Sequence, residues 1–102
     1  MGDIYAMRRA NGDWFAEEVN GRLHLPLFHT VHDAFMSRLR NFGMLFFQPV
    51  AFNARMLEQI DSKGEGDNVD FCIIDDPFVS LKRGQLLARE QLASLISGNR
   101  GV

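Results

Sequence analysis

The chain contains a single cysteine, Cys72, among its 102 residues. One cysteine excludes an internal disulfide and a zinc site built from cysteines alone. Long apolar segments are also missing: no run approaches the roughly 18–20 residues of a membrane-spanning helix, and the first residues lack the apolar core of a secretory signal peptide. The sequence therefore predicts a cytoplasmic protein that makes no contact with a membrane.

The motifs of several enzyme classes are absent as well. No serine has the sequence context of a nucleophile elbow, and there is no glycine-rich loop to cradle a phosphate. His29, His32 and Asp33 lie together at the start of a predicted helix, but His29 precedes that helix, so we expect no shared metal ion there. We therefore predict no cofactor. A formal net charge of −2 argues against a nucleic-acid partner.

Two Asn-Gly pairs, Asn11-Gly12 and Asn20-Gly21, are the strongest local signals in the chain. Asn-Gly between alternating segments is typical of a two-residue hairpin loop with a type I′ turn, which needs positive φ at both central residues. Two such turns predict a three-stranded antiparallel meander over about residues 4–28.

The two predicted turns agree on one apolar face of this meander. Arg9 pairs with Trp14 across the first turn, and Glu18 pairs with Leu23 across the second. Strand alternation then places these residues together on the core face: Tyr5, Met7, Trp14, Ala16, Leu23, Leu25 and Leu27. The opposite face is mixed, and we expect either a helix or a partner to cover it. Pro26 predicts an edge position for the third strand, or a stretch whose amide side is unpaired.

Helical and extended patterns alternate over the rest of the chain, so we expect one α+β domain spanning residues 1–102. The expected helices cover about residues 31–42, 54–60 and 83–97, and the expected strands, which extend the meander, cover about residues 44–52 and 69–75. We expect these helices to pack mainly on one face of the sheet. Thr30 is the expected N-cap of the first helix and Gly43 the residue just past its end. The apolar stripe of that helix is expected to face the core: Val31, Ala34, Phe35, Leu39 and Phe42.

The order of these segments carries a family resemblance. A strand ending in Leu25-Pro26-Leu27-Phe28 precedes a helix that begins at Thr30, and the later strand Val69–Asp75 precedes Asp76-Pro77 and a closing helix. This order resembles the N-terminal domain of bacterial SseB-like proteins, the enhanced-serine-sensitivity family, in which a Pro-Leu-Phe-Thr-like strand end precedes a helix and a later strand ends in an Asn-Pro-like pair. This chain departs from that pattern at Asp76-Pro77 and at His29, which separates Phe28 from Thr30. The resemblance implies a small bacterial α+β domain and supplies no catalytic residues.

Two places in the chain are candidates for function. The mixed sheet face has more apolar surface than a solvated face requires, and its candidate interaction residues are Phe15, Val19, Phe28, Arg8 and Arg22. Asp75 and Asp76 follow a buried strand, where paired carboxylates can hold a divalent cation, although a turn begun by Pro77 is the interpretation we favour. We expect a non-enzymatic module that binds another protein or itself, as a homodimer. The alternative is a small-molecule-binding or metal-binding protein, or an enzyme, that uses the Asp75-Asp76 pair.

Overall fold

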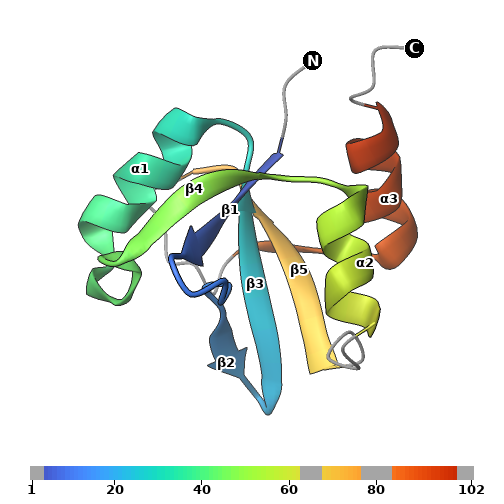
Figure 1. The fold of residues 1–102 in the computed structure, drawn as a ribbon, viewed down its shortest axis with the longest axis horizontal. Helices are drawn as coiled ribbons and strands as arrows, with labels where there is room; N and C mark the ends of the chain where they lie inside the picture. Colours follow the sequence, from blue (N-terminus) through green and yellow to red (C-terminus); the bar gives the residue numbers. More distant parts are fainter. Residues whose placement is uncertain (1–3, 63–67, 77–83, 99–102) are drawn as a thin grey trace.

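The computed structural model describes residues 4–62, 68–76 and 84–98, which form a layer of β-sheet with helices on both faces (Figure 1). The elements are, in chain order, β1 (Ile4–Arg9), β2 (Glu17–Val19), β3 (Arg22–Phe28), α1 (Val31–Arg40), the 3₁₀-helix η1 (Phe42–Met44), β4 (Phe47–Phe52), α2 (Ala54–Ser62), β5 (Val69–Ile74), β6 (Gln85–Leu87) and α3 (Arg89–Gly98). In this described part the sheet has six strands in the order β4-β1-β3-β5-β6, and β2 also pairs with β3. The predicted α+β class is confirmed.

β3 lies at the centre of the sheet. It runs parallel to β5 on one side, and on the other side it pairs with β2 near its start and with β1 at Phe28. Of the two alternatives predicted from Pro26, the edge position is therefore wrong. On one side of β3, Pro26 lies between the stretch paired with β2 and the residue paired with β1, and on the other side its partner is Cys72 of β5. Proline is tolerated within a sheet where its missing N–H is not needed for pairing.

The second Asn-Gly pair forms the predicted turn. Asn20 and Gly21 have φ values of 54° and 82°, as a type I′ turn requires. The strands on either side pair Glu18 with Leu23, and the predicted register of this hairpin is confirmed.

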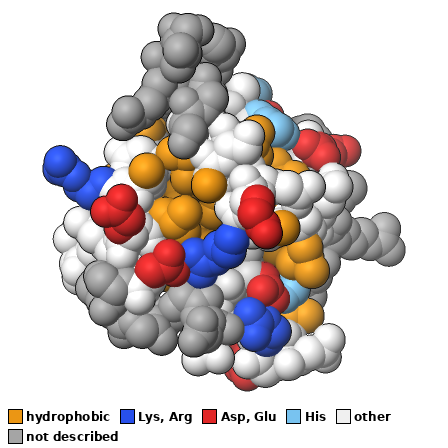
Figure 2. Space-filling model, turned by 90° about the vertical axis from the view of Figure 1, so that its right-hand side faces the viewer, with side chains coloured by type: hydrophobic (Ala, Val, Ile, Leu, Met, Phe, Trp, Pro, Cys, Tyr) orange, Lys and Arg blue, Asp and Glu red, His pale blue; other side chains and the backbone are white. Residues whose placement is uncertain are grey.

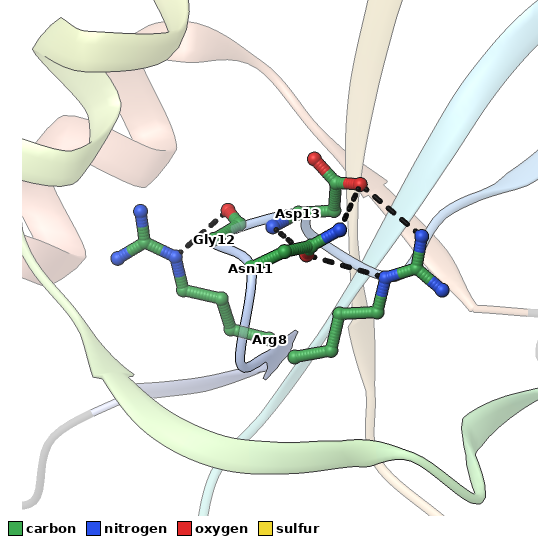
Figure 3. Close-up of polar contacts among 5 residues, drawn as sticks. Arg8, Asn11, Gly12 and Asp13 are labelled. Carbon is green, nitrogen blue, oxygen red and sulfur yellow. Dashed lines mark hydrogen bonds and ion pairs between the residues drawn. The ribbon is translucent and has the colours of Figure 1, made fainter.

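The first Asn-Gly pair forms a different turn. The Gly12 amide donates to the Arg9 carbonyl (2.9 Å) and the Arg9 amide donates to the Asp13 carbonyl (3.0 Å), and only Gly12 of the pair has positive φ, 97°. These are the features of a three-residue loop in which a type I turn is followed by a glycine bulge. In this first turn Asn11 Oδ1 accepts a hydrogen bond from the Asp13 amide (3.0 Å; Figure 3) and so holds an Asx turn.

The extra loop residue reverses the faces of β1. Trp14 bridges to Arg8 instead of the predicted Arg9, and a shift of one residue moves every side chain of a strand to the other face. Ile4 and Ala6 therefore join the core that was predicted to contain Tyr5 and Met7. Met7 lies in the core on the opposite face, so the predicted core face is wrong for β1.

Each face of the sheet has its own core. α2 and α3 cover the larger core, whose buried residues are Ile4, Ala6, Leu25, Leu27, Phe52, Ile60, Val69, Phe71, Ile73, Leu92 and Ile96. α1 covers the smaller core, which contains Met7, Phe28, Ala34, Met44 and Ile74. The expectation that the helices lie mainly on one face is wrong, because α1 lies on the opposite side of the sheet from α2 and α3 (Figure 1).

The helix starts follow the predicted caps more closely than the helix ends do. Thr30 Oγ1 accepts from the Asp33 amide (3.0 Å), which confirms the N-cap of α1. α1 ends at Arg40 and η1 follows, so Gly43 lies inside a 3₁₀ turn rather than just past the helix. β4 accordingly starts at Phe47, later than the predicted residue 44.

The last predicted helix is shorter than the sequence pattern indicates. Gln85–Leu87 pair with β5 as the strand β6, and α3 begins only at Arg89. The first part of the predicted 83–97 helix is thus a strand, and residue 83 lies outside the described residues. None of the described helices is long and apolar enough to cross a membrane.

Candidate functional site on the outer face of α1

Ala34 is buried as predicted, but the larger residues of the predicted apolar stripe face outward instead. Val31 is 41% exposed, Phe35 39% and Leu39 73%. The buried residues of this helix are Ala34 and Ser37. Small side chains at these two positions let the helix lie close to the sheet, and they leave its larger apolar residues on the outside.

Exposed apolar residues also follow α1 in the chain. Phe42 is 91% exposed, Leu45 57% and Phe46 79%. We call these residues and the three exposed residues of α1 the α1–η1 face: Val31, Phe35, Leu39, Phe42, Leu45 and Phe46. A phenylalanine side chain presents roughly 150–250 Å², so the three phenylalanines alone expose on the order of 400 Å². The largest apolar patch of a typical monomer covers about 300–600 Å², and the aliphatic residues of the face add to the aromatic area.

Backbone hydrogen bonds hold the chain at the outer end of this face. The Met44 amide donates to the Asn41 carbonyl (2.9 Å), and the Leu45 amide donates to the Phe42 carbonyl (3.1 Å). Asn41 Nδ2 donates to the Ser37 carbonyl (2.7 Å), and Met44, the last residue of η1, is fully buried. The fold therefore anchors Met44 inside while it presents Phe42 to solvent.

An arginine borders the face. The Arg38 guanidinium carbon lies 5.1 Å from the centre of the Phe35 ring, within the range of a cation–π contact. Arg38 Nη1 also donates to the Phe47 carbonyl (3.1 Å), which ties α1 to β4. An apolar centre with a charged border is the usual anatomy of a protein interface.

The interaction surface predicted from the sequence does not form as expected. Phe28 is completely buried under α1, so its inclusion was wrong. Phe15 is half-buried and its ring packs edge-on against Phe47, with ring centres 5.4 Å apart. Val19 is half-buried on the short strand β2. Any apolar surface left by Phe15 and Val19 is much smaller than the α1–η1 face.

The two arginines predicted for that surface make contacts within the chain. Arg8 Nε donates to the Gly12 carbonyl (2.9 Å; Figure 3), and its guanidinium lies 4.6 Å from the centre of the Trp14 ring. Arg22 forms two hydrogen bonds to the Asp70 carboxylate, of 2.8 and 2.9 Å. Hydrogen bonding to Arg22 is the main reason that the pKa of Asp70 lies below its usual value, against the opposing effect of burial. Arg8 thus stabilises the first turn, and Arg22 joins the start of β3 to β5.

The Asp75-Asp76 pair after β5 has one neighbour in the structure that the sequence did not predict. Asp75 and Asp76 are both exposed, and Asp75 Oδ1 lies 2.8 Å from His29 Nε2. His29 follows β3 and Asp75 follows β5, so the parallel pairing of these strands brings them together. Only a prediction of that pairing could have found this contact. Among the described residues, no three His, Cys, Asp or Glu side chains are grouped so that they could hold a metal ion.

The buried thiol has the properties of a core residue. Cys72 is 1% exposed in the middle of β5, and burial raises its pKa from an ordinary 9.0 to about 11. A thiol becomes nucleophilic only when it ionises. Cys72 is therefore unsuited to catalysis at neutral pH, as the sequence indicates.

A cavity of about 340 Å³ lies between the first turn, β3 and α2, with Trp14, Leu25 and Ile60 among its walls. The polar side chains at its edge pair with each other, since Arg9 Nη2 lies 3.3 Å from Asp13 Oδ2. In the described residues every buried side-chain nitrogen or oxygen has a hydrogen-bond partner. No unsatisfied polar group in this cavity therefore indicates a ligand.

The opposite side of the molecule offers a comparison. On the side formed by α2 and α3, apolar side chains gather in the middle of the view with acidic and basic side chains beside them (Figure 2). Two charged side chains of these helices, Arg89 of α3 and Asp61 of α2, form an ion pair at 2.8 Å. Leu95, at 39%, is an exposed large apolar residue of α3. Exposed apolar residues are thus more numerous on the α1–η1 face than on the described part of α3.

Comparisons of the chain with protein-family models, with curated proteins and with solved structures find no match. The resemblance to SseB-like domains therefore stays a prediction.

Proposed function

We propose that this chain is a protein–protein interaction module that acts through the α1–η1 face. The observation that carries the proposal is the outward position of six large apolar residues on one continuous segment, residues 31–46. Burying the roughly 400 Å² of phenylalanine surface would contribute on the order of 10 kcal/mol before the costs of association. A face of this kind is stabilised when a partner covers it.

The proposal keeps the class of function expected from the sequence and changes its location. The expected surface was the sheet face of Phe15 and Phe28, which α1 covers instead. The helix that removes this surface presents its own apolar side to solvent. The proposed interaction surface therefore lies on the outside of α1 and not on the sheet.

Affinity purification of the tagged protein from its own cells tests the proposal. The test variant is Leu39→Ser/Phe42→Ser, because both side chains are largely exposed and their loss leaves the core intact. The control variant is Leu23→Ser/Leu86→Ser, which changes two exposed leucines outside the face, on β3 and β6. We expect a stoichiometric partner, or a differently tagged second copy, to co-purify with the wild type and the control. It should be lost from the test variant.

Two results would count against the proposal. Equal recovery of the partner with the test variant would move the interaction away from the α1–η1 face. Recovery of the bare protein alone would remove the interaction module. A rise in melting temperature with Mg²⁺, Mn²⁺ or Zn²⁺ would then favour the alternative function at Asp75 and Asp76, since a ligand at about 100 times its dissociation constant adds roughly 2.7 kcal/mol of stability.

A further inference from the structure

We propose that Asn20 is a site of spontaneous deamidation in the folded protein and that the fold protects Asn11, although each of these asparagines precedes a glycine. Asn20 lies in the β2–β3 turn, at the opposite end of β3 from α1 (Figure 1). This site is separate from the α1–η1 face, so its chemistry is independent of the proposed function.

The side chain of an asparagine can react with the backbone amide of the next residue, most readily when that residue is glycine, which has no Cβ atom to shield its nitrogen. The Gly21 nitrogen attacks Asn20 Cγ and forms a bond to it. The bond from Cγ to Nδ2 breaks, and Nδ2 leaves as ammonia with the proton lost from the Gly21 nitrogen. Water then opens the resulting five-membered imide at one of its two carbonyls, which gives aspartate or isoaspartate. The net change is hydrolysis of a side-chain amide, with neither oxidation nor reduction.

The structure leaves both reacting groups of the Asn20-Gly21 pair accessible. Both residues are exposed, and within residues 4–62, 68–76 and 84–98 neither the Asn20 side chain nor the Gly21 amide makes a hydrogen bond. In the same part of the chain, a Cβ atom added to Gly21 would have no neighbour within 4 Å. Water can therefore reach the imide, and the Asn20 amide can turn toward the Gly21 nitrogen without breaking a side-chain hydrogen bond.

Hydrogen bonds hold the corresponding groups of the Asn11-Gly12 pair. Asn11 Oδ1 accepts from the Asp13 amide (3.0 Å) and from Arg9 Nε (3.3 Å), and Asn11 Nδ2 donates to Asp13 Oδ2 (3.0 Å; Figure 3). The attacking nitrogen is also engaged, because the Gly12 amide donates to the Arg9 carbonyl (2.9 Å). These bonds must break before the side chain can turn and the Gly12 nitrogen can attack. Because one hydrogen bond of ordinary net strength slows a step that breaks it by up to about tenfold, we expect Asn11 to react roughly tenfold or more slowly than Asn20.

The two products differ in their effect on the β2–β3 turn. Aspartate at position 20 keeps the backbone and adds a negative charge. Isoaspartate carries the chain through the former side chain, so the loop between Val19 and Arg22, which pair with each other, gains a backbone carbon. Because loop length fixes the register of a hairpin, we expect isoaspartate to weaken the pairing of β2 with β3. In the described sheet β2 pairs only with β3, so this change acts on the whole of β2.

Incubation of the full chain in warm, mildly alkaline buffer tests the site. Ammonia release gives the rate, and mass spectrometry of peptides locates the modified residue. In the folded protein we expect Asn20 to react roughly tenfold or more faster than Asn11. In denaturing urea the two rates should come within a few fold of each other, because unfolding frees both Asn-Gly pairs.

Matched variants assign the reaction to its residue. Asn20→Asp is one of the reaction's own products and tolerates the positive φ of this position, and it should remove most of the ammonia release from the folded chain. The control Asn11→Asp should leave that release unchanged. Arg9→Ala/Asp13→Ala removes the side-chain partners of Asn11 and should speed modification at Asn11 severalfold, with no change at Asn20.

Two results would overturn the proposal. Comparable rates at the two asparagines in the folded protein, or a faster reaction at Asn11, would show that the hydrogen bonds of the first turn give no protection. A folded chain that reacts at neither position, while the chain in urea reacts at both, would show that the β2–β3 turn is not a deamidation site.

Discussion

Gly84 occupies a position where the fold leaves no room for a side chain. A Cβ atom on this residue would lie 2.5 Å from Ile74 Cδ1 and 3.1 Å from the Cβ atom of Cys72. The chain makes this close approach just before Gln85, which pairs with Ile73 and begins β6. Because Ile74 and Cys72 are buried on β5, which lies inside the sheet between β3 and β6, they have little freedom to move away.

We predict that Gly84→Ala lowers the free energy of unfolding by about 1–3 kcal/mol, the usual cost of overpacking a core. For a domain of this size that corresponds to a melting temperature lower by roughly 4–8 °C for each kcal/mol. Thermal unfolding followed by circular dichroism measures the change. Ile74→Val removes the Cδ1 atom, so Gly84→Ala should cost less in an Ile74→Val background than in the wild type. Equal costs in the two backgrounds would contradict the steric explanation.

At the scale of elements, the two Asn-Gly turns show what a dipeptide can and cannot predict. The same pair gives a type I′ turn at Asn20 and a bulged type I turn at Asn11. The difference comes from Asp13, whose amide and carboxylate both bond to the Asn11 side chain, each at 3.0 Å (Figure 3). A local side-chain bond therefore decides the face of the whole strand β1.

Gly12 makes this turn possible, because its φ of 97° lies where other residues are strained. We predict that Gly12→Ala lowers the free energy of unfolding by roughly 1–2 kcal/mol. Gly12→Asn is the matched control and should cost less, since asparagine tolerates positive φ better than alanine. Urea unfolding of the three proteins gives the comparison. An alanine variant as stable as the asparagine variant would mean that the turn can adopt another conformation.

Helix and strand positions were predictable here where the local signals agree. Thr30 and Asn53 both cap helices as their residue types indicate, with hydrogen bonds of 3.0 and 3.1 Å. The helix predicted over about residues 83–97 includes Gln85–Leu87. The apolar spacing of so short a segment suits a helix and a strand equally well. Pairing with β5 decides for a strand, and that contact is not a local property of the sequence.

At the scale of the whole molecule, the candidate site was hidden by an assumption about burial. An apolar stripe at helical spacing is usually the side that faces the core, and Phe35 and Leu39 fit that rule. The structure buries Ala34 and Ser37 instead. Sequence periodicity shows that a helix has an apolar side, but it does not show whether the same chain or another one covers it.

A homodimer that forms through the α1–η1 face would make stability depend on concentration. When folding and dimer formation are coupled, each tenfold increase in protein concentration stabilises each chain by about 0.7 kcal/mol. We therefore predict that the melting temperature of the wild type rises by roughly 3–5 °C for each tenfold increase in concentration. Leu39→Ser/Phe42→Ser should melt at the same temperature throughout, because it cannot form the contact.

Melting temperatures at low protein concentration test whether Leu39 and Phe42 contribute to the stability of the single chain. Leu39 and Phe42 are 73% and 91% exposed in the single chain, so replacing them removes almost no packing within the monomer. The wild type and the serine variant should accordingly reach the same melting temperature as both are diluted. A variant that remains less stable at every concentration would show that these residues support the monomer, and its loss of association would then say nothing about a contact through the α1–η1 face.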